Sequence, residues 1–71
     1  MKYEPLTNLT EIRKSRGLSR RELAEQSEVS IMTITSLEQG LTNPLQAKIS
    51  TILAICKILK CKPSDLYPEL K

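Results

Sequence analysis

Residues 20–40 read RRELAEQSEVSIMTITSLEQG and carry the start and stop signals of two consecutive short helices. Ser19, directly before this stretch, is a favourable N-cap, and Glu22 three residues later completes a capping box. Ser30 is the corresponding N-cap of the second helix, and Gly40 is expected to end that helix in a left-handed conformation. Because only three residues separate the helices, the stretch is predicted to form a helix-turn-helix.

The apolar residues are spaced so that each helix turns one face toward the other. Ala24 is small enough to let the two helices approach closely. The predicted inward residues are Leu23, Ala24, Val29, Ile34 and Leu37. The opposite face of the second helix is left for a partner, and it carries Ile31, Met32, Thr35, Ser36 and Gln39.

The turn between the two helices contains Glu28. Many helix-turn-helix turns have glycine at this place, because the backbone there takes a positive φ that side chains disfavour. We expect Glu28 to adopt the left-handed conformation at a cost of about 1 kcal/mol.

The composition indicates one small helical domain over residues 1–71, with the helix-turn-helix core at residues 19–40. Two Tyr and no Phe or Trp leave Leu, Ile, Val and Ala to build the core. No apolar stretch approaches the ~20 residues of a membrane span, and the first residues lack the apolar segment of a signal peptide. A cytoplasmic location is therefore expected.

Nothing in the sequence favours catalysis, so an enzyme is not predicted. The chain has no His, no glycine-rich phosphate loop and no paired carboxylates. Cys56 and Cys61 lack the partners that a zinc site needs, and we expect both to be structural residues. No metal or other cofactor is predicted.

Positive charge is concentrated around the start of the helix-turn-helix. The net charge is +3, and residues 13–21 contain five basic residues and no acid. Such a run is commonly a solvated helix face, but beside a helix-turn-helix it favours a surface that faces phosphate. The five residues are Arg13, Lys14, Arg16, Arg20 and Arg21.

A first helix is predicted before this unit. Thr7 or Asn8 is its candidate N-cap, and Gly17 ends it. Residues 1–5 are expected to form an irregular arm. The apolar positions of this helix are Leu9 and Ile12.

The fourth helix has two candidate starts. Asn43 and Pro44 can cap and begin it, or Ser50 can be its cap with a loop before it. Either start leaves the same apolar stripe. Its members are Ile52, Ile55, Cys56 and Leu59.

A short fifth helix is predicted from residue 63 to about residue 67. Pro63 fits the first helical position, and Pro68 ends the helix. Leu66 is expected to face inward. Together these patterns predict an all-α domain of five helices.

The central stretch resembles the helix-turn-helix of the Cro/CI-type family, also called XRE-like or lambda-repressor-like. In weaker form the resemblance extends over residues 9–66 and favours Ser50 as the cap of the fourth helix. It implies a compact five-helix DNA-binding domain of bacterial or phage type, whose second helix-turn-helix helix enters the major groove. The matching residues are Leu18-Ser19, Glu22-Leu23-Ala24, Val29-Ser30, Thr33-Ile34 and Leu37-Glu38-x-Gly40.

In that arrangement residues 31–39 form the recognition helix, and four of its residues would reach base edges. Family members often carry Gln, Arg, Lys or Asn at such positions. Here Ile31 and Met32 favour contacts with thymine methyl groups and leave more discrimination to DNA shape. Alternatively, this apolar pair is covered by another protein. The predicted base-contacting residues are Ile31, Met32, Thr35 and Ser36.

Phosphate contacts are expected at helix starts and in the loop after the recognition helix. Arg20 and Ser30 stand at helix starts, where free N–H groups favour phosphate. The resemblance adds the loop that clasps the DNA strand, and it places Arg13 close to the DNA backbone. The predicted phosphate-contacting residues are Arg13, Arg20, Ser30, Gln39, Thr42, Asn43 and Lys48.

Arg13 has a second implied role. With Glu38 it matches a pair that forms a salt bridge between the first and third helices of relatives. That role is mainly structural, and removal of Glu38 is therefore expected to destabilise the fold.

These features predict sequence-selective binding to double-stranded DNA by a small transcriptional regulator, a repressor. One such module contacts few base pairs, so a homodimer on an approximate palindrome is expected. Candidate dimer surfaces are Tyr67, Leu70 and the outer side of the fourth helix. The alternative is a protein-interaction module of the same fold, an anti-repressor or antitoxin subunit, which uses Ile31 and Met32 on a protein partner.

Overall fold

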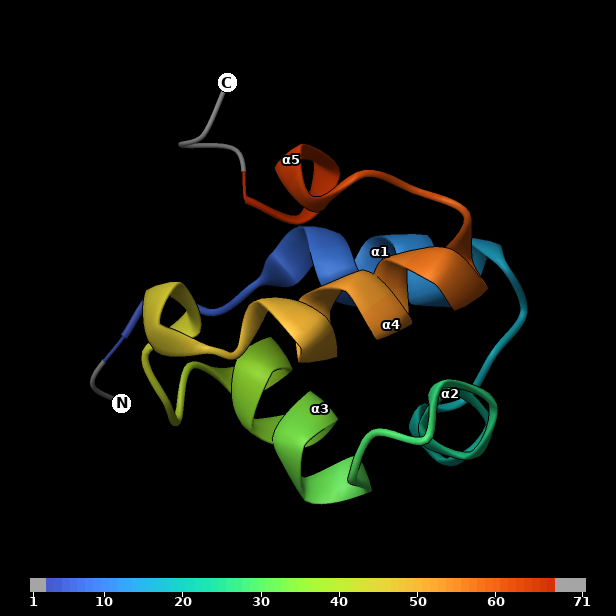
Figure 1. Cartoon of the computed structure of the whole chain (residues 1–71), viewed down its shortest axis with the longest axis horizontal. Coiled ribbons are helices and arrows are strands. Elements are labelled where there is room, and N and C mark those ends of the chain that lie inside the picture. Colours follow the sequence, from blue (N-terminus) through green and yellow to red (C-terminus); the bar gives the residue numbers. More distant parts are fainter. Residues whose placement is uncertain (1–2, 68–71) are drawn as a thin grey trace.

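The computed structural model describes residues 3–67, which form five α-helices and one 3₁₀ turn without a β-strand (Figure 1). This confirms the predicted all-α architecture. Within these residues, no helix combines the length and apolar character that crossing a membrane requires. The elements are α1 (Thr7–Ser15), α2 (Arg20–Ser27), α3 (Ile31–Gln39), η1 (Pro44–Gln46), α4 (Ile49–Leu59) and α5 (Pro63–Leu66).

The helix-turn-helix, α2 and α3, has the caps that were predicted for it. The Ser19 hydroxyl accepts a hydrogen bond from the Glu22 N–H at 3.1 Å, and the Glu22 carboxylate accepts one from the Ser19 N–H at 2.8 Å. The Ser30 hydroxyl accepts from the Met32 N–H at 3.1 Å. Glu28 is left-handed, with φ of 61°. Local sequence therefore determines the boundaries of both helices.

The C-terminal end of α1 also follows the prediction. Gly17 has φ of 73°. Its N–H donates to the Lys14 carbonyl at 2.9 Å, and the Leu18 N–H donates to the Arg13 carbonyl at 3.2 Å. These two bonds make a Schellman motif, which satisfies carbonyls that the helix itself leaves free.

The start of α1 differs from the prediction, because neither Thr7 nor Asn8 caps it. Leu6 stands at the N-cap without a side-chain hydrogen bond. The Leu6 side chain is buried, and its N–H donates to the Leu37 carbonyl at 3.0 Å. Asn8 instead donates its side-chain amide to the Asp65 carbonyl of α5 at 3.1 Å. Contacts with α3 and α5 therefore set this helix start.

Of the two candidate starts of the fourth helix, the one at Asn43 and Pro44 begins a separate 3₁₀ turn rather than the helix. The Asn43 carboxamide oxygen accepts from the Leu45 N–H at 3.0 Å, but the segment that it caps is the separate turn η1. α4 begins at Ile49 after Lys48, which has an extended backbone at the N-cap position. Ser50 as the N-cap was therefore wrong, because Ser50 already lies inside the first turn of α4.

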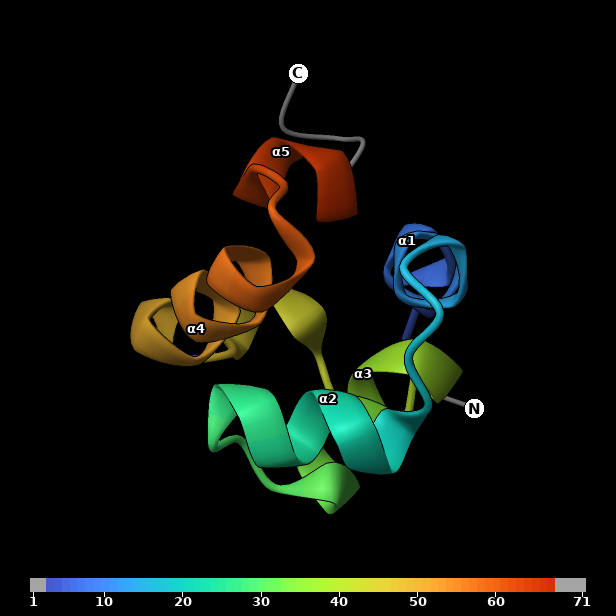
Figure 2. The same ribbon diagram turned by 90° about the vertical axis from the view of Figure 1, so that its right-hand side faces the viewer.

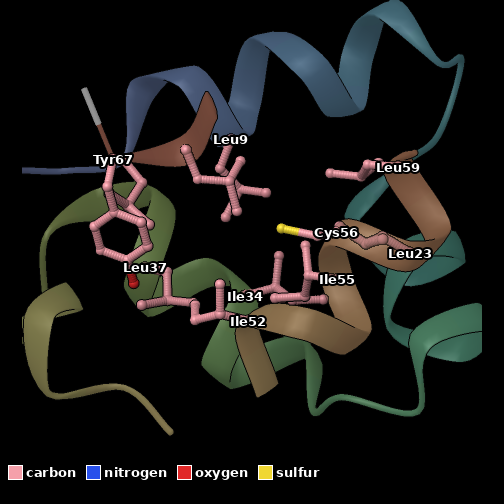
Figure 3. Packing of buried hydrophobic residues seen from close by; sticks show 11 residues of the cluster. Leu9, Leu23, Ile34, Leu37, Ile52, Ile55, Cys56, Leu59 and Tyr67 are labelled. Carbon is pink, nitrogen blue, oxygen red and sulfur yellow. The ribbon is translucent and has the colours of Figure 1, made fainter. Parts of the chain in front are cut away.

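The helices pack around one core. α2 contacts α3 and α4, while α1 contacts α3 and α5 (Figure 2). The predicted stripe of α4 is buried in this core, and Ala24 and Val29 pack against it half-buried. Figure 3 shows the core side chains pointing toward one another from the different helices. The core residues are Leu6, Leu9, Leu23, Ile34, Leu37, Ile52, Ile55, Cys56, Leu59, Leu66 and Tyr67.

The N-terminal arm lies against the end of α3. The Tyr3 N–H donates to the Gly40 carbonyl at 3.3 Å. Gly40 has φ of 72°, and a Cβ at this position would collide with the Tyr3 carbonyl oxygen and lie 3.2 Å from the Pro5 nitrogen. Both the left-handed backbone and the close approach of the arm therefore require glycine here.

Candidate nucleic-acid interface

The first turn of α3 exposes two large apolar side chains. Ile31 is 42% exposed and Met32 is 72% exposed, whereas Ile34 on the opposite face is buried completely. Thr35 and Ser36 are half-buried. The amino-terminal end of α3 lies at the lower edge of Figure 1, away from α1 and α5. The four predicted base-contacting residues thus share one helix, and the two apolar ones are the more exposed.

Glu38 is held inside the domain by two arginines. Its carboxylate accepts hydrogen bonds from Arg13 Nε at 2.7 Å and Arg13 Nη2 at 3.3 Å, and from Arg20 Nε at 2.8 Å. The Glu38 side chain is 1% exposed, Arg13 8% and Arg20 36%. The expected link between α1 and α3 is present, and Arg20 extends it to α2. This cluster fixes α3 relative to α1 and α2.

The protonation of Glu38 follows from the same geometry. Burial by itself raises the pKa of a carboxyl group, and here it is the largest single influence. The hydrogen bonds from Arg13 and Arg20 and the charge of Arg13 together outweigh burial, so the pKa of Glu38 is lowered. Glu38 therefore stays ionised between the two guanidinium groups at neutral pH.

The run of basic residues does not form one continuous patch. Arg13 and Arg20 bind Glu38, and Arg16 Nε donates to the Leu59 carbonyl at 2.7 Å, at the C-terminal end of α4. Lys14 and Arg21 are exposed. Arg21 lies in the first turn of α2 beside Arg20. The sequence placed Arg21 in the basic run, but not among the residues predicted to contact phosphate.

The other predicted phosphate-contacting residues are spread from the start of α3 to the start of α4. Ser30 caps α3, and Lys48 is exposed at the N-cap position of α4. Gln39 and Thr42 are exposed between them. Asn43 is half-buried and holds the start of η1 with its side chain. The set therefore comprises two helix starts and the loop that joins the two helices.

Of the residues predicted to form a dimer surface, some are buried in the structure and others are exposed. Tyr67 is 5% exposed, and its hydroxyl donates to the Pro44 carbonyl at 2.6 Å, so its proposed place on a dimer surface was wrong. The reason is that this hydroxyl anchors η1 to the end of α5. Leu70 and the predicted helix end at Pro68 lie outside the described residues. The outer side of α4 does expose apolar residues, Ile49 and Leu53.

The two cysteines close the C-terminal end of α4. The Cys61 N–H donates to the Cys56 carbonyl at 3.1 Å across left-handed Lys60. Burial raises the pKa of the Cys56 thiol to about 12 and, to a smaller extent, the pKa of Cys61. Residues 3–67 contain no group of three or more side chains arranged to hold a metal ion.

A capped helix-turn-helix with an exposed recognition helix defines the class of helix-turn-helix DNA-binding domains. Comparison with protein families agrees, since the model of the Cro/C1-type HTH DNA-binding domain matches residues 8–68. The chain belongs to this family. Searches of curated proteins and of solved structures find no significant match.

Proposed function

We propose that this chain is a small transcriptional repressor that binds double-stranded DNA sequence-selectively, with α3 in the major groove. The observation that carries the proposal is the exposed first turn of α3 on a helix whose opposite face is buried. A protruding helix end of this kind fits the width of the major groove. Base contacts would come from Ile31, Met32, Thr35 and Ser36.

Phosphate contacts would flank that turn. Arg20 uses Nε for Glu38, but a guanidinium has five N–H donors, so Arg20 keeps donors for phosphate while Glu38 orients it. Arg21 beside it would add a second cation. Arg13 is left out of this set because its side chain is 8% exposed and is bound to Glu38. The remaining contacts would come from Ser30, Gln39, Thr42, Asn43 and Lys48.

We further propose that the protein binds as a homodimer to an approximate palindrome. One module of this size contacts few base pairs, and two-fold pairing doubles the site. The exposed Ile49 and Leu53 support a self-association surface on α4, and Leu45 of η1 is also exposed. Such a regulator would act at the nucleoid of a bacterial or phage-infected cell.

A second candidate function rests on the same exposed apolar pair. Ile31 and Met32 could instead be covered by a protein partner, as in an anti-repressor or antitoxin subunit. The two functions differ in their response to salt. Phosphate contacts release counterions, so DNA affinity falls steeply with salt, while apolar contact with a protein does not.

The test is selection of a random duplex pool by the purified protein at low and near-physiological salt, followed by sequencing. An enriched palindrome supports the dimeric regulator. Arg21→Ala should then weaken all sequences alike and reduce the salt slope by about 1. Lys62→Ala is the control, because it removes the same charge at the residue directly before α5. In Figure 1, α5 lies at the opposite end of the molecule from the first turn of α3. Absence of any enriched sequence would contradict the proposal.

A further inference from the structure

The outward face of α3 has no charged side chain. The structure describes every residue from 31 to 39, and Glu38 is the one charged residue among them. Its side chain is 1% exposed and bound by two arginines. Gln39 supplies an amide only in the last turn. In the first turn, the exposed side chains are Ile31 and Met32.

This composition limits the base edges that the first turn can recognise. Guanine is read by Arg or Lys, adenine by Asn or Gln, and the cytosine amino group by Asp or Glu. Ile31 and Met32 have none of these groups. Pressed against a polar base edge, they would displace its water without replacing the hydrogen bonds. The apolar feature of the major groove that suits them is a methyl group on a pyrimidine ring.

We propose that Ile31 and Met32 recognise pyrimidine C5-methyl groups in the major groove and accept 5-methylcytosine in place of thymine. This inference rests on the proposed function, because it requires α3 to lie in the groove. Both bases carry the methyl group at C5 and differ at C4, where thymine has an oxygen acceptor and cytosine an amino donor. An apolar side chain cannot distinguish these two groups.

The neighbouring residues of α3 also do not favour thymine over 5-methylcytosine. Thr35 and Ser36 are half-buried hydroxyl residues, and a hydroxyl can both donate and accept. They can therefore adapt to the oxygen of thymine or to the amino group of 5-methylcytosine. The discriminating feature is then the methyl group itself, so methylation of a cytosine at a contacted position should strengthen binding.

The experiment uses the best duplex from the selection described above, with dissociation constants measured at one fixed salt concentration. Each thymine of a half-site is replaced in turn by deoxyuridine, which lacks only the methyl group. We expect about a fourfold loss of affinity for each contacted methyl. At the same positions, a 5-methylcytosine·guanine pair should bind about fourfold more tightly than a cytosine·guanine pair.

Protein variants connect the effect to the two side chains. Ile31→Ala and Met32→Ala should each abolish the deoxyuridine penalty at one position of the half-site. Gln26→Ala is the control, an exposed residue of α2 outside both sets of proposed DNA contacts, and it should keep every penalty. Because Ile31, Met32 and Gln26 are exposed, these variants should retain the circular dichroism spectrum of the parent.

The possible results distinguish a failure of methyl recognition from a failure of the proposed DNA binding. A selected duplex that binds equally well with thymine and deoxyuridine overturns methyl recognition and leaves the DNA-binding function in place. A penalty that persists in both alanine variants also overturns it, because other residues then contact the methyl groups. Failure to select any duplex overturns the proposed function itself.

Discussion

Replacing Glu38 by alanine should remove the acceptor on which two arginines converge. Arg13 Nε and Nη2 would lose partners at 2.7 Å and 3.3 Å, and Arg20 Nε would lose one at 2.8 Å. Arg13 cannot regain water easily, because its side chain is 8% exposed. The variant therefore leaves a positive charge inside the domain without its carboxylate.

The size of the effect is set by Arg13. Removal of one partner from a buried ion pair costs about 3–5 kcal/mol. Arg13 keeps its hydrogen bond to the Leu18 carbonyl at 2.8 Å, and Arg20, at 36% exposure, can be rehydrated. Both features place the cost near the lower end, about 3 kcal/mol. A domain of this length has roughly 4–10 kcal/mol of unfolding free energy, so the loss is a large share of it.

Thermal and urea unfolding followed by circular dichroism would measure this loss. A cost of about 3 kcal/mol corresponds to a Tm lower by about 12–24 °C for a domain of this size. The control is Gln39→Ala, an exposed neighbour on the same helix, which should stay within about 0.5 kcal/mol of the parent. If Glu38→Ala melts no more than about 4 °C below the parent, the reasoning is refuted.

A double variant tests the physical cause. Replacing a buried ion pair by apolar residues of similar size is often neutral, so Arg13→Met combined with Glu38→Leu should recover most of the stability. If the double variant is as unstable as Glu38→Ala, the cost arises from lost packing rather than from the orphaned charge of Arg13.

Three further outcomes follow from the backbone and from the ionisation of Glu38. Gly40→Ala should lower the unfolding free energy by about 2–5 kcal/mol, since it combines left-handed strain with a collision against the arm. Gly17→Ala has the same left-handed strain, but its added Cβ meets no atom of residues 3–67 within 4 Å, so the unfolding free energy should fall by only about 1–2 kcal/mol. Equal urea midpoints for the two glycine variants would contradict the collision at Gly40. Glu28→Gly should raise the unfolding free energy by up to about 1 kcal/mol, because Glu28 has φ of 61° and glycine adopts this conformation without strain. The control Glu25→Gly, inside α2, should lower the unfolding free energy by about 1 kcal/mol. A lower Tm for Glu28→Gly than for the parent would contradict the strain. Because the pKa of Glu38 is lower in the folded protein than in the unfolded chain, ionised Glu38 stabilises the fold fully above its unfolded-state pKa. This stabilisation is lost as the pH falls through the pKa of Glu38 in the folded protein. Unfolding free energy should therefore fall less steeply below pH 4.5 in Glu38→Gln than in the parent, and parallel pH profiles would exclude this linkage.

Much of the helix-turn-helix could be predicted from the sequence because its signals act over short distances. A cap, a left-handed residue and an apolar face each depend on residues within about four positions of one another. Ser19, Glu28, Ser30 and Gly40 therefore adopt the predicted conformations. The exposure of Ile31 and Met32 also follows from the helical period, because the buried face leaves them on the other side.

Tertiary contacts decided what these local signals could not. The start of α1 depends on Leu6 binding to α3, and Tyr67 is buried because its hydroxyl reaches Pro44, 23 residues earlier. Arg20 was expected to face phosphate alone, but it shares Glu38, 18 residues away, with Arg13. A side chain's partner across such distances depends on how helices pack, and no periodic pattern in one segment specifies it. Short-range hydrogen bonding therefore made the bounds of α3 predictable from the sequence, while long-range packing determined which cations remain exposed beside it.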